Sequence, residues 1–205
     1  VSPMAMRLIR SRAGESEEEV REYLYGSIEE LSDACQMKGM REAVSLLREK
    51  IREGARIRII GDYDIDGVNA THILITALRR AGADADTVIP DRLKDGYGIN
   101  EHLIGNAKEA GIDTIVTCDN GIAAAQEIAY AKGLGMTVIV TDHHDIPYRE
   151  ESDGSRTTIL PPADVIVNPK QADCPYPFKK LCGAAVAWRL AEALYREEGI
   201  PREEF

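Results

Sequence analysis

The chain has 205 residues, of which 44% are hydrophobic and 29% are charged, and its formal net charge is −10 at pH 7. This composition is typical of a folded globular protein and excludes an intrinsically disordered chain. Proteins that bind nucleic acid through broad electrostatic attraction are normally basic. The acidic balance therefore indicates that any contact with phosphate relies on bound metal and a few placed cations.

The sequence carries no signal for a membrane or a secretory pathway. No apolar run approaches the length of a membrane span, and residues 1–12 lack the apolar core and cleavage site of a signal peptide. The four cysteines are widely scattered, without a Cys-x-x-Cys pair. We therefore expect a cytoplasmic protein with no membrane association.

The first third of the chain is predicted to be helical. Segments 15–25, 27–37 and 39–54 are rich in Glu, Arg, Leu and Ala, with apolar residues at spacings of three and four. In the third segment one apolar stripe is formed by Met40, Val44, Leu47 and Ile51. We expect residues 1–55 to form an N-terminal helical segment that packs on the core of the following domain.

From residue 56 onward, short β-branched runs alternate with amphipathic stretches. The expected strands are 57–61, 87–90, 114–117, 137–141 and 165–167. The expected helices are 68–81, 101–110, 122–132 and 181–198, and the segment 147–163 is predicted to be a surface loop. This alternation predicts an α/β fold over residues 56–205, with an open, mainly parallel five-stranded sheet flanked by helices.

A polar residue follows each expected strand. In a parallel sheet these positions share the carboxyl edge, where such folds bind ligands. The residues are Asp62, Asp91, Asp119, Asp142 and Asn168. Side chains that are far apart in the sequence are therefore expected to meet in one crevice.

The first acidic cluster holds Asp62, Asp64 and Asp66 at alternate positions. A turn or a helix cap is the simpler explanation, and Asp66 before Gly67 is a plausible N-cap. A cap needs only one such residue, however, and neighbouring carboxylates repel one another unless a cation lies among them. The spacing therefore favours a metal site, although the later ligands of an EF-hand are absent.

The second cluster, Asp142-His143-His144, adds imidazole to the carboxylates. Adjacent side chains in extended backbone point apart, so one histidine can bind metal while its neighbour faces substrate or supports the ligands. This donor mixture favours Mn²⁺ or Mg²⁺. Asp119 could be an ordinary turn residue, but at a metal-binding edge it could bridge two ions. Two-metal sites of this kind stabilise displacement at phosphorus.

Two further residues are candidates for substrate binding. Arg92 offers a planar fork for a phosphate, and Tyr97 offers a face on which a base can stack. The alternatives are a solvated loop charge for Arg92 and simple packing for Tyr97.

With these motifs the chain resembles the DHH phosphoesterase superfamily, and within it the RecJ-type single-strand-specific exonucleases. The resemblance spans residues 56–193 and rests on the segments 61–67, 91–98, 119–121, 142–144 and 181–184. It implies a catalytic domain with two Mn²⁺ or Mg²⁺ ions that degrades single-stranded DNA from the 5′ end, in DNA repair and recombination.

The resemblance also implies residue roles. Asp64, Asp66, Asp119 and His143 correspond to metal ligands, with Asp119 bridging the two ions, and Asp62 is either a ligand or a neighbour that supports one.

In the same correspondence, His144 faces the scissile phosphate and Asp142 orients its neighbours. Arg92 holds a substrate phosphate.

The family places a further aspartate ligand and then a second domain, DHHA1, beyond the point at which this sequence ends. We therefore expect the N-terminal part of a longer protein, with an incomplete metal site and little or no exonuclease activity alone. Two alternatives remain: a nanoRNase or cyclic-dinucleotide phosphodiesterase of the same superfamily, and a catalytically inactive replication scaffold with a DHH fold.

Overall fold

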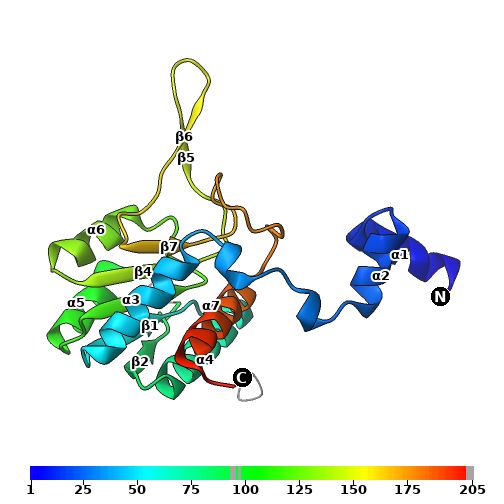
Figure 1. Ribbon diagram of the computed structural model, residues 1–205. Helices are drawn as coiled ribbons and strands as arrows, with labels where there is room; N and C mark the ends of the chain where they lie inside the picture. Colours follow the sequence, from blue (N-terminus) through cyan, green and yellow to red (C-terminus); the bar gives the residue numbers. More distant parts are fainter. Residues whose placement is uncertain (93–95, 97, 202–205) are drawn as a thin grey trace. The chain divides into compact units, whose positions relative to one another are not determined.

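The computed structural model describes residues 1–92, 96 and 98–201, and the chain forms two compact units, Val1–Asp33 and Ala34–Phe205 (Figure 1). Each unit is described by itself below. Among the described residues, no helix combines the length and the apolar character that crossing a bilayer requires.

The first unit contains two α-helices, α1 (Pro3–Ala13) and α2 (Glu17–Tyr25). A capping box at Ser16 and Glu19 starts α2, as is common where Ser precedes Glu by three residues. The predicted helix over 27–37 is wrong. Ser27 starts only one 3₁₀ turn, η1 (Ile28–Glu30), which stops at Leu31 in extended backbone, and a second turn, η2 (Ala34–Gln36), follows.

The third helix, α3 (Met40–Arg52), belongs to the second unit. The predicted stripe is confirmed, since Met40, Val44 and Leu47 are buried and Ile51 packs against the same core. This face lies against β7 and α7. The apolar face of α3 is therefore part of the core around the sheet, and the first compact unit ends at Asp33.

The second unit is built on the predicted parallel five-stranded sheet, with strand order β2-β1-β3-β4-β7 (Figure 1). Its strands are β1 (Arg56–Ile60), β2 (Asp84–Val88), β3 (Thr114–Cys118), β4 (Thr137–Thr141) and β7 (Val165–Val167). Its remaining helices are α4 (Ile65–Arg80), α5 (Glu101–Glu109), α6 (Ala125–Gly133) and α7 (Gly183–Glu198). The predicted fold class is therefore confirmed.

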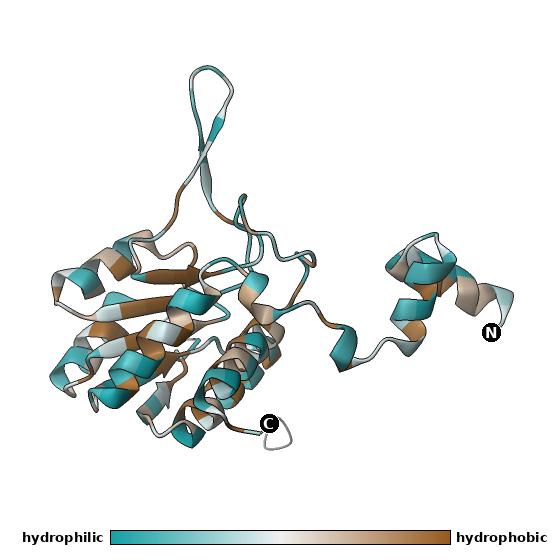
Figure 2. Ribbon diagram, viewed as in Figure 1, coloured by the Kyte–Doolittle hydropathy of each residue, from teal (hydrophilic) through white to brown (hydrophobic). Residues whose placement is uncertain are grey.

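Helices cover both faces of the sheet, so the central strands β3 and β4 are buried on both sides (Figure 2). Along β4, Ile139 faces the core formed with α3, α4 and α7, while Val138 and Val140 face the core formed with α5 and α6. This alternation follows from the two-residue period of a strand. Parallel strands that are buried on both faces are expected to be continuous apolar runs. The central strand β4 is close to this pattern, whereas the edge strand β2 carries two aspartates and has one buried residue.

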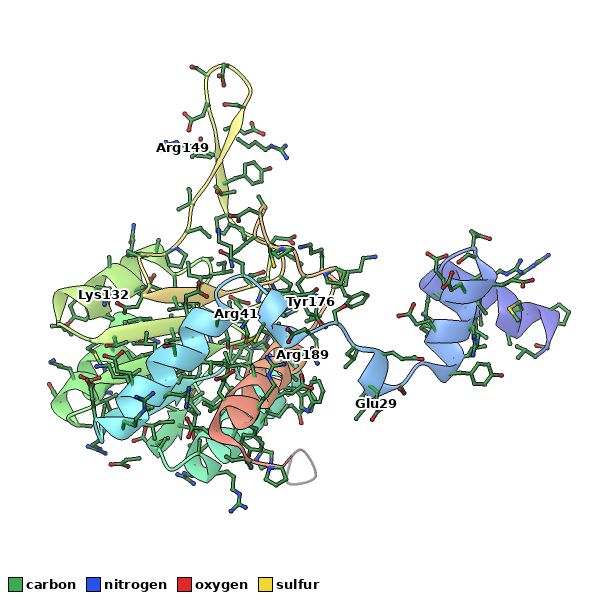
Figure 3. All side chains as sticks on the ribbon, in the orientation of Figure 1. Glu29, Arg41, Lys132, Arg149, Tyr176 and Arg189 are labelled. Atoms are coloured by element: carbon green, nitrogen blue, oxygen red, sulfur yellow. The ribbon has the colours of Figure 1, made fainter. Side chains whose placement is uncertain are left out.

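The segment 147–163, predicted as a surface loop, contains a two-stranded antiparallel hairpin of β5 (Tyr148–Glu150) and β6 (Arg156–Thr158). Figure 1 shows it projecting from the body of the unit, and Arg149 lies on it, away from the sheet (Figure 3). Every residue of both strands is exposed. Without an apolar face the hairpin has no hydrophobic pattern, so the sequence reading missed it.

The order of the strands creates a switch point between β1 and β3. The chain leaves β1 through α4 on one face of the sheet and leaves β3 through α6 on the other. Ligands of open α/β sheets bind in the crevice at the carboxyl ends of such a strand pair. The backbone continues the ladder just past the strands, since the N–H of Asp119 donates to Thr141 O at 3.1 Å and that of Asp142 donates to Val167 O at 3.0 Å.

Candidate metal centre

The first acidic cluster begins α4. Asp64, rather than the expected Asp66, is the N-cap: its Oδ1 accepts hydrogen bonds from the backbone N–H of Asp66 at 2.9 Å and of Gly67 at 3.0 Å. The cap lies two residues earlier because the helix already starts at Ile65. A Cβ on Gly67 would lie 2.6 Å from the Asp62 side chain and backbone, so only glycine allows this close turn.

Asp62 is a buried carboxylate with 2% of its surface exposed. Among the described residues, its Oδ1 atom has no hydrogen-bond partner. Burial, followed by the nearby charges of Asp64 and Asp142, raises the pKa of Asp62 against the opposing effect of a backbone hydrogen bond at Tyr63. An orphaned buried carboxylate oxygen is costly, and a bound cation would compensate it.

Asp66 connects the first cluster to the start of α7. Its Oδ2 accepts from the backbone N–H of Gly183 and its Oδ1 accepts from that of Ala184, both at 2.7 Å. A carboxylate in this position satisfies helix N–H groups and interacts favourably with the helix dipole. A Cβ on Gly183 would lie 2.5 Å from Asp119 Oδ1, so the small residue lets α7 start directly against the acidic cluster.

Asp119 lies at the centre of the cluster with 1% of its surface exposed. Its φ angle is +62°, in the left-handed region that few residues other than glycine adopt. Burial, together with the charges of Asp66, Asp64 and Asp142, raises the pKa of Asp119 to about 7, while His144 opposes the shift. Both the backbone strain and the raised pKa are typical of functional sites.

The Asp142-His143-His144 turn adds two imidazoles. His143 Nε2 lies 3.0 Å from Asp119 Oδ1 and 3.6 Å from Asp66 Oδ2. His144 Nδ1 lies 2.7 Å from Asp142 Oδ1 and 4.0 Å from Asp119 Oδ1. The centroids of the two rings are only 4.5 Å apart, so the imidazoles lie side by side near Asp119 and do not point apart as the sequence predicted.

Asp142 organises this turn from a buried position. Its Oδ1 accepts from the backbone N–H of His143 at 2.7 Å and of His144 at 3.0 Å, and its Oδ2 accepts from that of Ile122 at 2.9 Å. Burial raises the pKa of Asp142, but the hydrogen bonds from the His144 ring and the backbone N–H groups outweigh it and lower the pKa overall. The hydrogen bond to Asp142 raises the pKa of His144.

The donor atoms form two groups that share Asp119. In the group Asp62, Asp64 and Asp119, and in the group Asp119, His143 and His144, the candidate ligand atoms all lie within 4.8 Å of one another. One group offers three carboxylates and the other offers one carboxylate and two imidazoles, and Asp119 is common to both, so the two groups could hold two divalent ions. Together with the orphaned oxygen of Asp62, this donor set fits the metal ions that the sequence predicts.

Of the two expected substrate-binding residues, Arg92 is among the described residues and Tyr97 is not. Arg92 is exposed, and its guanidinium carbon lies 5.5 Å from the centroid of the Tyr63 ring, within the range of a cation–π contact. Tyr63, inside the first acidic cluster, was not singled out from the sequence. The expected base-stacking residue Tyr97 lies outside the described residues.

Two buried asparagines support the centre. Asn120 donates to Ile60 O at 3.0 Å and to Cys118 O at 2.9 Å, which ties the ends of β1 and β3 together. Asn168 donates to His144 O at 3.0 Å. The sequence predicts that Asn168 lies at this edge of the sheet but predicts no role for it. The position of Asn120 and of Asn168 close behind a strand is the sequence feature that could have indicated their supporting role.

The fold and the site define an open parallel α/β domain whose carboxyl edge gathers carboxylates and imidazole from separate strands. Residues 56–205 match the model described as "DHH family, N-terminal domain". The chain belongs to the DHH family.

Comparison with known proteins agrees with this assignment. The chain is 41% identical over 197 residues to the single-stranded-DNA-specific exonuclease RecJ of Bacillus subtilis (strain 168), covering 96% of this chain and 24% of that protein. A crystal structure of exonuclease RecJ bound to manganese matches with a TM-score of 0.68 and 39% identity, over 80% of this chain and 39% of the other.

A second solved structure, RecJ from Thermus thermophilus in complex with Mn²⁺, matches with a TM-score of 0.65 and 31% identity. That match covers 98% of this chain and 28% of the other. The chain thus spans about a quarter to two fifths of the length of these relatives.

Proposed function

We propose that this chain is the DHH part of a metal-dependent phosphodiesterase, a single-strand-specific 5′-to-3′ DNA exonuclease of RecJ type that acts in DNA repair and recombination. The observation that carries the proposal is that Asp119 belongs to both groups of candidate ligands at the carboxyl edge of the sheet. The relatives named RecJ support the choice of substrate.

Two divalent cations, Mn²⁺ or Mg²⁺, are proposed as cofactors. Four of the residues proposed to hold them, Asp62, Asp64, Asp119 and His143, fall in the two groups of candidate ligands. The fifth is Asp66, whose Oδ2 lies 3.6 Å from His143 Nε2. Bound ions of this kind supply positive charge near the phosphate oxygens and lower the pKa of an attacking water. Similar RecJ structures in complex with Mn²⁺ and with Mg²⁺ support both ions.

His144 and Asp142 are proposed as the catalytic pair. Asp142 fixes the His144 ring through Nδ1 and favours its protonated form, since the pKa of His144 is raised. A protonated imidazole beside a reacting phosphate can hold a proton for the leaving oxygen and stabilise developing negative charge. Asp142 positions that ring, because its carboxylate is buried and engaged by backbone N–H groups.

The proposed substrate contacts involve the segments that follow β1 and β2. Arg92 is proposed to bind a DNA phosphate, with the Tyr63 ring supporting the guanidinium through the cation–π contact. Tyr97 remains a proposed stacking residue, and a DHHA1 domain in the full-length protein remains a proposed partner for gripping the strand. Cytoplasmic location and the domain roles of residues 1–55 and 56–205 also remain predictions.

The experiment that tests the proposal compares labelled single-stranded and duplex DNA in the presence of Mn²⁺ and of EDTA. We expect the full-length protein to release mononucleotides from the 5′ end of single strands only, and Asp119→Asn to abolish this release. Preferential cleavage of di- and trinucleotides or cyclic dinucleotides would favour the nanoRNase or phosphodiesterase alternative. A folded protein that binds no Mn²⁺ would support the scaffold and refute the proposal.

A further inference from the structure

A cavity of about 430 Å³ opens beside His144. Its walls come from the loop that follows β3, from the start of α6 and from the segment that precedes α5. This volume lies within the range of small-molecule sites, which is roughly 300–1,000 Å³. The sequence motifs 91–98 and 119–121 touch these segments, but Ile99, Ile122 and Ala124 carry no predicted role.

The cavity walls are mostly apolar or backbone. Ile99 and Ile122 line it and are themselves almost fully buried, with 4% and 1% of their surfaces exposed. Asn120 also lines it, but its polar atoms are engaged: the amide donates to Ile60 O and Cys118 O, and Oδ1 accepts from the N–H of Ile99. Such walls can pack against a ring system without making hydrogen bonds that distinguish one base from another.

The charge of the cavity disfavours a phosphate. Among the described residues that line it, there is no lysine or arginine, and Glu127 contributes a carboxylate. Glu127 lies in the first turn of α6, so a negative charge already occupies the helix end that would otherwise attract an anion. A neutral ligand with hydrogen-bond donors fits these walls better than an anionic one.

The same cavity touches the proposed reaction centre, because Asp142 and His144 line one end of it. A phosphodiester at His144 has a nucleoside on either side of the phosphate. We propose that this cavity binds one of those two nucleosides, with its base and sugar against Ile99, Ile122 and Ala124 and a donor group directed to Glu127. This inference rests on the proposed function. It adds the site at which the uncharged nucleoside part of the substrate binds.

Binding of thymidine and of inorganic phosphate, each without metal, tests the cavity directly. We expect millimolar thymidine to shift the NMR methyl resonances of Ile99, Ile122 and Ala124 in the full-length protein, and phosphate to leave them unchanged. Ala124→Leu, which narrows the cavity, should weaken thymidine binding at least about tenfold. Ala129→Leu is the matched control, since Ala129 is exposed on α6, the helix that Ala124 precedes, and does not line the cavity.

Absence of thymidine shifts at these methyl groups, or shifts caused by phosphate instead, would overturn the proposal. A kinetic arm separates its failure from failure of the proposed function. With Mn²⁺, Ala124→Leu should lower the ratio of kcat/KM for the dinucleotide pTpT to that for bis(p-nitrophenyl) phosphate at least about tenfold. An unchanged ratio in an active enzyme refutes the nucleoside site, whereas loss of both activities in the unaltered protein refutes the phosphodiesterase.

Discussion

Asp119 Oδ1 lies 3.0 Å from His143 Nε2, although the two residues follow different strands and are separated by a whole helix and strand in the sequence. The parallel register explains this contact. Cys118 at the end of β3 is paired with Thr141 at the end of β4, so the residues just beyond both strands emerge side by side. The metal-site predictions below follow from this convergence.

Replacing Asp119 with Asn should remove most of the Mn²⁺ affinity. Asparagine has the same shape and tolerates the left-handed backbone at this position, so the fold should persist. We expect Mn²⁺ binding, measured by isothermal titration calorimetry, to weaken by at least about tenfold. Asp153→Asn, on the exposed hairpin, should bind like the unaltered protein. Equal affinity in Asp119→Asn would show that this residue is no ligand.

The raised pKa of Asp119 predicts a pH-dependent difference in stability without metal. Since the folded state holds the proton up to about pH 7 and the unfolded state loses it near pH 4, folding stability from this group falls as pH rises through that window. Relative to Asp119→Asn, the free energy of unfolding of the unaltered protein should fall by on the order of 4 kcal/mol across this window, at about 1.4 kcal/mol per pKa unit. Urea unfolding at several pH values in EDTA measures this, and a constant difference would contradict it.

Added Mn²⁺ should reverse that loss, because metal and proton compete for the same carboxylate. In thermal unfolding above pH 7, we expect Mn²⁺ to raise the Tm of the unaltered protein, and EDTA to remove the increase. Below pH 5 the increase should be small. If the increase in Tm caused by Mn²⁺ did not depend on pH, the ion would not bind at Asp119.

Gly183→Ala should distort the centre without changing any donor atom. The new Cβ would lie 2.5 Å from Asp119 Oδ1, so α7 or the carboxylate must shift. We expect weaker Mn²⁺ binding and a destabilisation of about 1–3 kcal/mol. Gly105→Ala within α5 is the matched control, because its Cβ would meet nothing within 4 Å, and it should be neutral or stabilising. Similar behaviour of the two variants would contradict the close approach of α7.

The hydrogen bond between Asp142 and His144 should be visible in the titration of the imidazole. Asp142→Asn removes the negative charge while keeping the shape, so the pKa of His144, followed by NMR, should fall towards its ordinary value. Asp145→Asn is the control: that neighbouring carboxylate pairs with Lys170 at 2.8 Å instead. A larger fall in Asp145→Asn than in Asp142→Asn would be inconsistent with the assigned contact.

Asn168→Ala tests the support behind His144. The buried amide donates to His144 O at 3.0 Å and its Oδ1 accepts from the N–H of Lys170 at 2.8 Å, so its loss leaves both backbone groups without these partners. We expect a destabilisation of about 1–3 kcal/mol. Asn69→Ala, at an exposed position of α4, should change stability by no more than about 0.5 kcal/mol. Equal losses of unfolding free energy in Asn168→Ala and Asn69→Ala, measured by chemical denaturation, would show that Asn168 does not support the site.

The sequence by itself determined the α/β class, four of the five strands and the edge at which the acidic and histidine clusters meet. Those features depend on hydrophobic periodicity and on the geometry shared by all parallel sheets, which local patterns carry. The second strand, expected at 87–90, runs from Asp84 to Val88. Patterning failed at 27–37 and 147–163, where short turns and an exposed hairpin bury too little to leave a period.

Only the tertiary structure decided which neighbours each site residue has. That Asp64 rather than Asp66 caps α4, that Gly183 and Ala184 hold Asp66, and that Tyr63 lies near Arg92 all depend on contacts that the folded chain creates. The same is true of the pKa of Asp119, which is set by burial and by charges from other strands. These contacts and the pKa shift depend on distances between residues in the folded chain, and the spacing of residues along the sequence does not give those distances.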